Sequence, residues 1–294
     1  NNFQGAVKID GVNVVVVDAG AIDLGASTVT GTYAVTATAG GNITDSGVLA
    51  ITAAATFTAA GGQSIHLDSA NTFSSTIAFT SGGTLTNVTI SDSNDFDFAA
   101  LTLSGNLNAT STGGSVTDSG ALAITGVTTV DASSGNVTLD TATNNFQGAV
   151  EIDGVNVLVV DGGAIDLGAS TVTGTYAVTA TTGNISDSGN LAVTGTATFI
   201  TGASGSNIIL DASGNAFSNA VTLQADDGSD TFGNITFVDS GAVRLHSSAG
   251  ANGDLYINAA TDAAVGGNLN VTATTGNITQ GRVVVVSGTS SFTT

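Results

Sequence analysis

The chain repeats itself, and this repetition is what most limits the folds that it can adopt. Residues 1–40 reappear at 144–183 with four substitutions, which sets a long period of 143 residues. Inside that period, segments such as GNITDSG (41–47), GSVTDSG (114–120) and GNISDSG (183–189) recur. Measured from one apolar anchor residue to the next, twelve such segments between Val14 and Ile278 lie about 24 residues apart.

Each short repeat consists of alternating apolar and polar residues, interrupted by Gly, Asn, Ser and Asp. This pattern is typical of short strands joined by tight corners, and no stretch shows the 3.6-residue stripe of a helix. We therefore predict an all-β fold, a parallel β-helix (β-solenoid) of about 12 coils with about 24 residues each. Residues 1–294 are expected to form one continuous solenoid. Modules 1–143 and 144–286 would hold six coils each, and 287–294 would begin a further one.

Strand alternation also predicts which side chains fill the interior. We expect Val, Ile, Leu and Phe to point inward and Thr, Ser and Asp to point outward. Phenylalanines recur at comparable places, which predicts a stacked core ladder of Phe3, Phe57, Phe73, Phe146, Phe199, Phe217 and Phe292.

The charge balance excludes some partners. The formal net charge is −20, with only three Lys and Arg residues, so the chain is poorly suited to bind nucleic acid or an anionic membrane surface. The sequence has no run of 18 or more apolar residues, so it does not predict a membrane-spanning helix. The chain has no cysteine, which fits an extracellular location.

The repeat sequences of the chain resemble those of a known group of proteins. VTATTGNISDSGNLAVTGTATF (178–199) is similar to the repeat region of filamentous-haemagglutinin-type adhesins, which are bacterial surface proteins secreted by a two-partner route. The resemblance covers the whole chain and implies a right-handed parallel β-helix displayed outside the cell. Only the shaft region is represented, because neither the secretion domain nor an Arg-Gly-Asp tripeptide is found in the sequence.

Aspartates follow the anchor residues at regular offsets and are the best candidates for a binding site. They are Asp18, Asp45, Asp68, Asp92, Asp118, Asp140, Asp161, Asp187, Asp211 and Asp239. One interpretation is structural: each carboxylate accepts a hydrogen bond from a nearby backbone N–H and shapes a corner. A second interpretation is a cation-binding edge, with Ca²⁺ as the expected ion. Two dense clusters favour Ca²⁺, one of Asp92, Asp95 and Asp97 and the other of Asp226, Asp227 and Asp230.

The sequence offers little support for catalysis. A β-helical polysaccharide-active enzyme shares this architecture, but no nucleophile–base arrangement is visible and the near-exact duplication does not favour one specialised site. We expect no enzymatic activity, no catalytic residue and no cofactor beyond Ca²⁺.

The function that the sequence favours is an extracellular structural or adhesive filament shaft at the cell surface. Its expected partners are further copies or flanking repeats, head to tail, and host or surface glycans. The acidic, Thr-rich sequence is also compatible with a Ca²⁺-binding surface-layer or matrix protein and with an ice-binding solenoid.

Overall fold

The computed structural model describes residues 1–225, 233–246, 254–257, 264–265, 267–281 and 284–294. These residues form strands, turns and irregular segments, and no helix long and apolar enough to cross a bilayer occurs among them. The chain divides into two compact units, residues 1–148 and 149–294.

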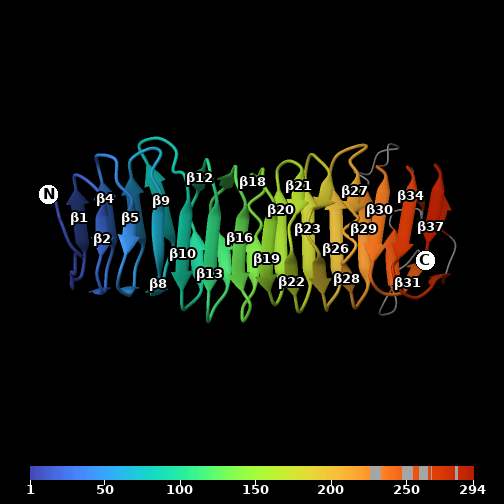
Figure 1. Cartoon of the computed structure of the whole chain (residues 1–294), viewed down its shortest axis with the longest axis horizontal. Coiled ribbons are helices and arrows are strands. Elements are labelled where there is room, and N and C mark those ends of the chain that lie inside the picture. The colour runs from blue at the N-terminus through green and yellow to red at the C-terminus, as the bar shows by residue number, and fades with distance from the viewer. Residues whose placement is uncertain (226–232, 247–253, 258–263, 266, 282–283) are drawn as a thin grey trace. The chain divides into compact units, whose positions relative to one another are not determined.

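Unit 1 is a parallel β-solenoid, whose strands lie side by side in Figure 1, coloured from blue to green. Its first sheet consists of β1 (Val14–Asp18), β4 (Tyr33–Ala37), β7 (Ala55–Ala59), β9 (Ile77–Ser81), β11 (Phe96–Phe98), β14 (Val116–Asp118) and β17 (Val137–Leu139). Its second sheet consists of β2 (Ile22–Leu24), β5 (Ile43–Asp45), β8 (Ile65–Phe73), β10 (Val88–Asp92), β13 (Leu107–Ser111) and β16 (Thr128–Ala132). Two shorter rows complete the coils: β3 (Ser27–Val29) and β6 (Leu49–Ile51) with the end of β8, and β12 (Leu101–Leu103), β15 (Leu122–Ile124) and β18 (Asn145–Phe146).

Unit 2 is built in the same way. Its first sheet holds β20 (Val157–Asp161), β23 (Tyr176–Ala180), β26 (Ala197–Thr201), β29 (Val221–Ala225), β32 (Asp254–Ile257), β31 (Val243–His246) and β35 (Ile278–Gln280). A second row holds β21 (Ile165–Leu167), β24 (Ile185–Asp187), β27 (Ile208–Leu210), β30 (Ile235–Asp239), β34 (Leu269–Ala273) and β37 (Ser290–Thr293). A third row holds β19 (Val150–Gly154), β22 (Ser170–Val172), β25 (Leu191–Val193) and β28 (Ala216–Phe217), and β33 (Ala264–Val265) pairs with β36 (Val285–Val286). The predicted parallel β-solenoid is confirmed.

The coils are shorter than the predicted 24 residues. In unit 1, Val14 pairs with Tyr33, Tyr33 with Ala55 and Ala55 with Ile77, and successive coils lie about 21 residues apart. The estimate was too long because the anchor residues do not share one face: Ile43 lies in the second sheet, whereas Val116 lies in the first. The spacing between such anchors therefore includes an extra fraction of a coil. With coils of this shorter length, residues 14–139 contribute seven strands to the first sheet of unit 1.

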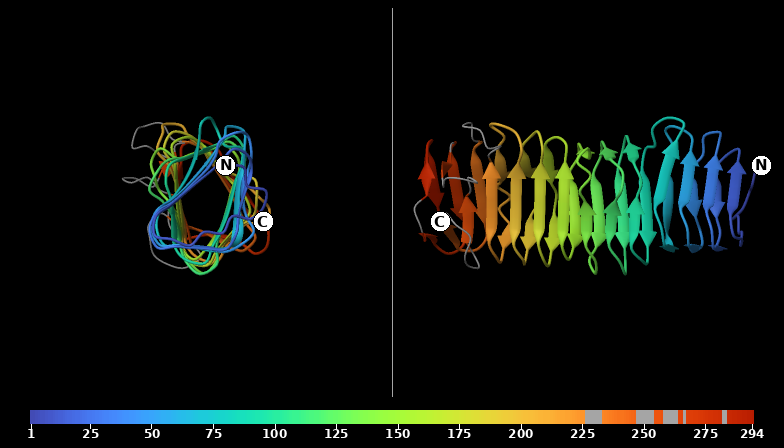
Figure 2. Two further views of the ribbon diagram at one scale, coloured as in Figure 1. Left: turned by 90° about the vertical axis from the view of Figure 1, so that its left-hand side faces the viewer. Right: turned by 180° about the vertical axis from the view of Figure 1, so that it is seen from behind.

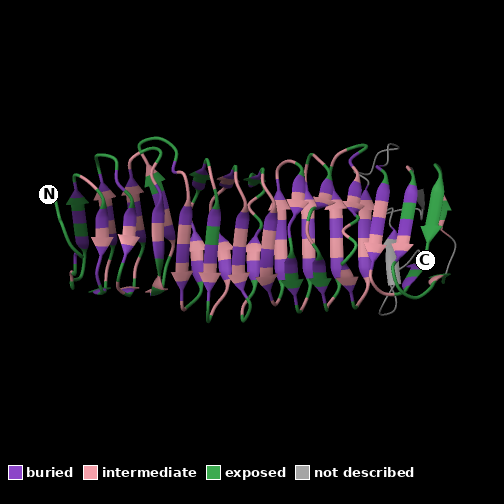
Figure 3. Cartoon of the chain, in the orientation of Figure 1, coloured by how far each residue is buried: buried purple, intermediate pink, exposed green. Residues whose placement is uncertain are grey.

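The interior of each unit is filled as strand alternation requires. In β4 and β23 the inward positions are Tyr, Val and Ala, and in both strands every second residue is buried. Figure 3 shows this alternation as regular bands of buried and less buried residues along the strands. The end-on view in Figure 2 shows that, within each unit taken by itself, successive coils wind around an interior.

Aromatic side chains stack between coils, as predicted for most of the ladder. Phe57 contacts Tyr33 and Phe73 edge to face and stacks on Phe79 at a centroid distance of 5.9 Å. In unit 2, Phe199 contacts Tyr176 and Phe217 edge to face, and Phe146 of unit 1 is also buried. Phe3 and Phe292 differ from the prediction, because they are 37% and 49% exposed on the terminal coils of their units.

Candidate functional site: buried carboxylates between coils

Most of the aspartates point into the solenoid, and this corrects the expectation that they face solvent. Seven of the ten are buried: Asp18, Asp45, Asp92, Asp118, Asp161, Asp187 and Asp239. Asp68, Asp140 and Asp211 are exposed. Strand parity explains the division, because the seven lie two or four residues after an inward-facing anchor and the three lie three residues after one.

Three of the buried aspartates belong to a recurring arrangement that we call the Asp–Asn bracket. It joins Asp45 to Asn71, Asp118 to Asn144, and Asp187 to Asn215, each pair across two successive coils. In every copy the asparagine Nδ2 donates to the aspartate Oδ2, at 2.7, 2.7 and 2.6 Å. The three asparagines are fully buried and the aspartates are 7–8% exposed.

Each bracket also binds the backbone of both coils. The Oδ1 of the asparagine accepts the amide N–H of a leucine in the earlier coil, for example Leu122 to Asn144 at 2.7 Å. The Oδ1 of the aspartate accepts an amide N–H from the later coil, for example Asp140 to Asp118 at 2.9 Å. The bracket therefore satisfies buried donors and acceptors that would otherwise destabilise the fold.

A sequence signature accompanies the bracket. The aspartate begins Asp-Ser-Gly-x-Leu-Ala-Ile/Val, at 45–51, 118–124 and 187–193, and the asparagine begins Asn-x-Phe, at 71–73, 144–146 and 215–217. The glycine is required by the stacking of the coils: a Cβ on Gly120 would lie 2.2 Å from the backbone nitrogen of Ala100. Gly47 and Gly189 have the same kind of contact, at 2.3 and 2.1 Å.

A second set of aspartates caps the Asn-x-Phe strands from the following coil. The Phe73 N–H donates to Asp92, and the Phe217 N–H donates to Asp239 at 3.2 Å. The Phe3 N–H likewise donates to Asp18, at 3.1 Å. The Asn-x-Phe segments that begin at Asn71 and Asn215 are thus each held by one carboxylate from the preceding coil and one from the following coil.

The interpretation that each aspartate binds the N–H two residues ahead holds for part of the set. Asp92 accepts the N–H of Asn94, Asp161 that of Gly163, and Asp239 that of Gly241. The bracket aspartates instead bind groups on the next coil. Sequence reasoning missed their asparagine partners, although the recurrence of Asn-x-Phe 26 to 28 residues after each Asp-Ser-Gly was a usable signal.

Corner asparagines form a further row of bonds between coils. In unit 1 the Oδ1 of Asn87 accepts the Asn106 N–H at 2.8 Å, and the Oδ1 of Asn106 accepts the Val127 N–H at 2.9 Å. In unit 2 the row runs through Asn184, Asn207, Asn234 and Asn268 to the Thr289 N–H. Side-chain carbonyls thus extend the backbone ladder around the corners of the coils.

The first predicted Ca²⁺ cluster does not converge. Asp92 is buried and binds Phe73 and Asn94, whereas Asp95 is exposed and accepts the Ser115 N–H at 2.5 Å. The Asp97 side chain points outward from β11 and accepts the hydroxyls of Thr76, Thr117 and Ser119. No group of three or more His, Cys, Asp or Glu among the described residues is placed to hold a metal ion. Asp226, Asp227 and Asp230 lie outside the described residues, so a site there stays a prediction.

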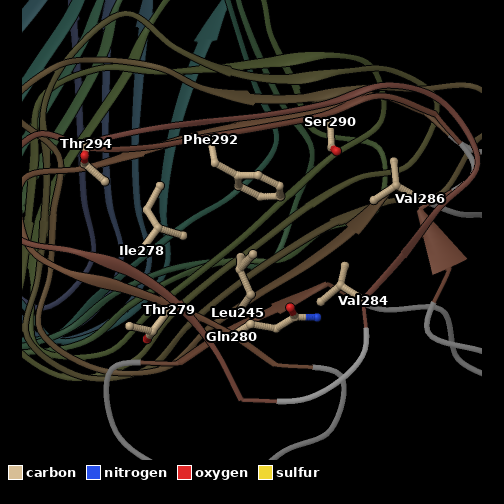
Figure 4. A pocket seen from close by; sticks show the side chains of 9 residues that line it. All are labelled: Leu245, Ile278, Thr279, Gln280, Val284, Val286, Ser290, Phe292 and Thr294. Carbon is tan, nitrogen blue, oxygen red and sulfur yellow. The ribbon is translucent and has the colours of Figure 1, made fainter.

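A hollow of about 560 Å³ opens at the last coil of unit 2. Figure 4 shows the apolar side chains of Leu245, Ile278 and Phe292 around it, together with Gln280. None of the described residues that line it has a carboxylate, histidine or lysine side chain. These apolar groups continue the inward-facing rows of the solenoid, so the hollow belongs to its interior and is not a separate binding site.

Burial changes the acidity of the carboxylates. It raises the pKa of Asp92 to about 6, from 3.8, and the hydrogen bonds from Asn94 and Phe73 offset only part of this effect. Burial also raises the pKa values of Asp45, Asp118, Asp187 and Asp239. Hydrogen bonds from asparagine and from backbone N–H groups limit the rise in the pKa of the bracket aspartates. The fold therefore holds these five aspartates in an environment that favours the protonated form more than water does.

The pH dependence of stability follows from these shifts. Because the folded pKa values lie above the unfolded ones, the folded chain binds more protons than the unfolded chain between about pH 4 and pH 6. We expect the melting temperature to rise as the pH is lowered from 7 to 5 at constant ionic strength, measured by circular dichroism. Asp92→Asn should flatten this dependence, since the substitution removes the most strongly shifted group while leaving the net repulsion of the acidic chain almost unchanged. A melting temperature that falls between pH 7 and pH 5 would contradict the prediction.

Comparison with known proteins connects the bracket to a family. No curated protein and no solved structure matches the chain. A model of repeats of unknown function (DUF5649) matches residues 11–80, 85–153 and 154–224 in succession. Each matched repeat contains one complete Asp–Asn bracket, and each also has a buried aspartate, Asp18, Asp92 or Asp161, seven residues after its first residue. The three matches cover most of the chain, which therefore belongs to the family of repeats of unknown function (DUF5649).

Proposed function

We propose that the chain is a shaft segment of an extracellular structural or adhesive filament, displayed at the cell surface. The observation that carries the proposal is the Asp–Asn bracket, which occurs once in each family repeat and there joins one coil to the next. A shaft needs stiffness distributed along its length, and repeats that contact only their neighbours supply it when every interface is strong. The resemblance to filamentous-haemagglutinin-type shafts agrees with this role.

The exterior fits the same role. Outward positions on the strands are rich in Thr and Ser, for example Thr36, Thr58 and Thr80, which lie in register on β4, β7 and β9. Together with the net charge of −20, such a surface remains hydrated and resists non-specific association between shafts. Partners of the shaft would be further repeats at its ends and glycans on opposing surfaces. Ca²⁺ binding, activity on polysaccharides and ice binding stay predictions.

Mechanical unfolding tests the shaft. The full chain, held between two marker domains of known unfolding force, is pulled by atomic force microscopy. A shaft should unfold in steps that release multiples of one coil, and about 21 residues correspond to roughly 70 Å of extended chain. Its unfolding forces should equal or exceed those of the marker domains. Smooth extension at the low force of an unstructured chain would overturn the proposal.

Location is tested separately. Antibodies raised against the purified chain should label intact cells of the source organism, while a control antibody against a cytoplasmic protein should label only permeabilised cells. Labelling by the chain-specific antibodies that also requires permeabilisation would exclude a surface filament.

A further inference from the structure

One outward face of unit 2 carries aliphatic side chains and no charge. It is formed by β20, β23 and β26, neighbouring strands of the first sheet that lie side by side in Figure 1. Their residues pair one to one, without a bulge. Because alternate residues of a strand point to opposite sides, the outward residues, which we call the uncharged face, are Leu158, Val160, Ala177, Thr179, Thr198 and Ile200.

The absence of charge is a local property of this face. The chain has 23 Asp and Glu residues and a formal net charge of −20. On the other rows of unit 2, outward positions include Glu151 and Asp153 on β19 and Asp166 on β21. Next to β26, the outward residues of β29 continue the face with Thr222 and Gln224, which are also uncharged. Two copies of this acidic chain can therefore meet here without opposing their carboxylates.

The largest side chains of the face are aliphatic and only partly covered. Leu158, Val160 and Ile200 are half-buried, because they point away from the interior that their strands enclose. The strand β26 reads Ala-Thr-Phe-Ile-Thr, whereas β7 of unit 1 reads Ala-Thr-Phe-Thr-Ala, so Ile200 stands where unit 1 has Thr58. Covering these aliphatic groups would remove apolar surface from water, which favours association.

We propose that the uncharged face of unit 2 packs against the same face of a second copy of the chain. A two-fold axis makes one surface complementary to itself, and two sheets pack face to face about 10 Å apart. The proposal rests on the shaft function and adds that shafts associate side by side. A charged partner would find no group of opposite sign on this face, whereas a second copy presents the same aliphatic rows.

The size of the face sets the strength of the pairing. Strands about 4.8 Å apart, with residues about 3.3 Å apart, give β20 to β29 a face of roughly 300 Å². This is well below the ~800 Å² per partner that a stable complex buries. One unit should therefore pair weakly, with a dissociation constant of about 0.1–1 mM. Many units along two shafts would add up to a tight association.

Sedimentation equilibrium of the purified full chain, at up to about 1 mM, tests the pairing. The chain should dimerise more strongly in about 500 mM than in about 50 mM NaCl, because salt screens the repulsion between two acidic molecules. Ala177→Glu lies on the central strand of the face and should weaken dimerisation by about tenfold or more. The matched control is Ala192→Glu, an exposed position on β25 in another row, which should change the dissociation constant by less than about twofold. Equal weakening by both substitutions, or a native chain that stays monomeric at high salt, would overturn the proposal.

Exchange of charge across the dimer provides a second test that does not depend on the folding of one variant. Ala177→Lys alone should also weaken dimerisation, whereas an equimolar mixture of Ala177→Lys and Ala177→Glu should form heterodimers, because unlike charges then meet near the two-fold axis. Circular dichroism shows that each variant is folded. A mixture of folded variants that remains monomeric would contradict the pairing. Binding of the native chain to phosphatidylcholine vesicles that Ala177→Glu abolishes, without dimerisation, would make a lipid surface the occupant and the proposal wrong. None of these measurements involves surface display or unfolding force, so the pairing and the shaft function can fail independently.

Discussion

Asn144→Ala is expected to destabilise unit 1 by about 3–5 kcal/mol, because the substitution leaves the buried Asp118 carboxylate and the Leu122 N–H without their partner. Asn144 is fully buried, so water cannot replace the lost bonds without opening the coil. The free energy of unfolding is measured by guanidinium denaturation. Hydrogen exchange at Leu122 then shows whether the loss is centred on the bracket, as the nearest-neighbour energetics of a solenoid require.

Asn145→Ala is the matched control, since Asn145 is the next residue along the chain, begins β18 and is exposed. Its expected effect is within about 0.5 kcal/mol. Asp118→Ala in the Asn144→Ala background should cost much less than Asn144→Ala costs in the native chain, because the buried carboxylate that lost its asparagine partner is then gone. Equal losses for Asn144→Ala and Asn145→Ala would show that the bracket contributes nothing to stability.

The second large effect is expected from Gly120→Ala. The added Cβ would lie 2.2 Å from the nitrogen and 2.8 Å from the Cα of Ala100, both backbone atoms of the preceding coil. Because neither atom belongs to a flexible side chain, the two coils must separate locally. We expect a loss of about 3 kcal/mol or more, measured as a fall in the denaturation midpoint.

Gly82→Ala separates this steric effect from the general effect of replacing a glycine. Gly82 lies in the same unit, and a Cβ added there would have no atom within 4 Å. Its substitution should change stability by less than about 1 kcal/mol in either direction. If Gly120→Ala is tolerated as well as Gly82→Ala, the coils are not packed as closely as the structure shows.

The fold was predictable because the repeat and the strand alternation act locally and agree with each other. Residues such as Ile43 and Val116 mark inward positions in the sequence itself. The coil length was harder to predict, because motifs of the same appearance occupy different faces. The burial of the aspartates was within reach: Asp45 lies two residues after Ile43 and must share its face, whereas Asp68 lies three residues after Ile65 and must not.

The bracket itself was not predictable from a single motif. Asp118 and Asn144 are 26 residues apart, and their contact exists only because one coil lies on the next. Neither residue type indicates the other, since Asp and Asn are both common at corners for reasons within one coil. The Asp92, Asp95 and Asp97 cluster shows the opposite difficulty. Closeness in sequence suggested shared ligation, yet alternation directs Asp92 and Asp97 to different sides of the chain.

The family repeat of about 70 residues is not a whole number of coils of about 21 residues. Successive brackets therefore start from different sheets: within unit 1, Asp45 ends a strand of the second sheet and Asp118 ends a strand of the first. Bending toward any one side stretches the opposite side, and a weak side would act as a hinge. Because the two brackets of unit 1 start from different sheets, they resist bending toward two different sides of the unit.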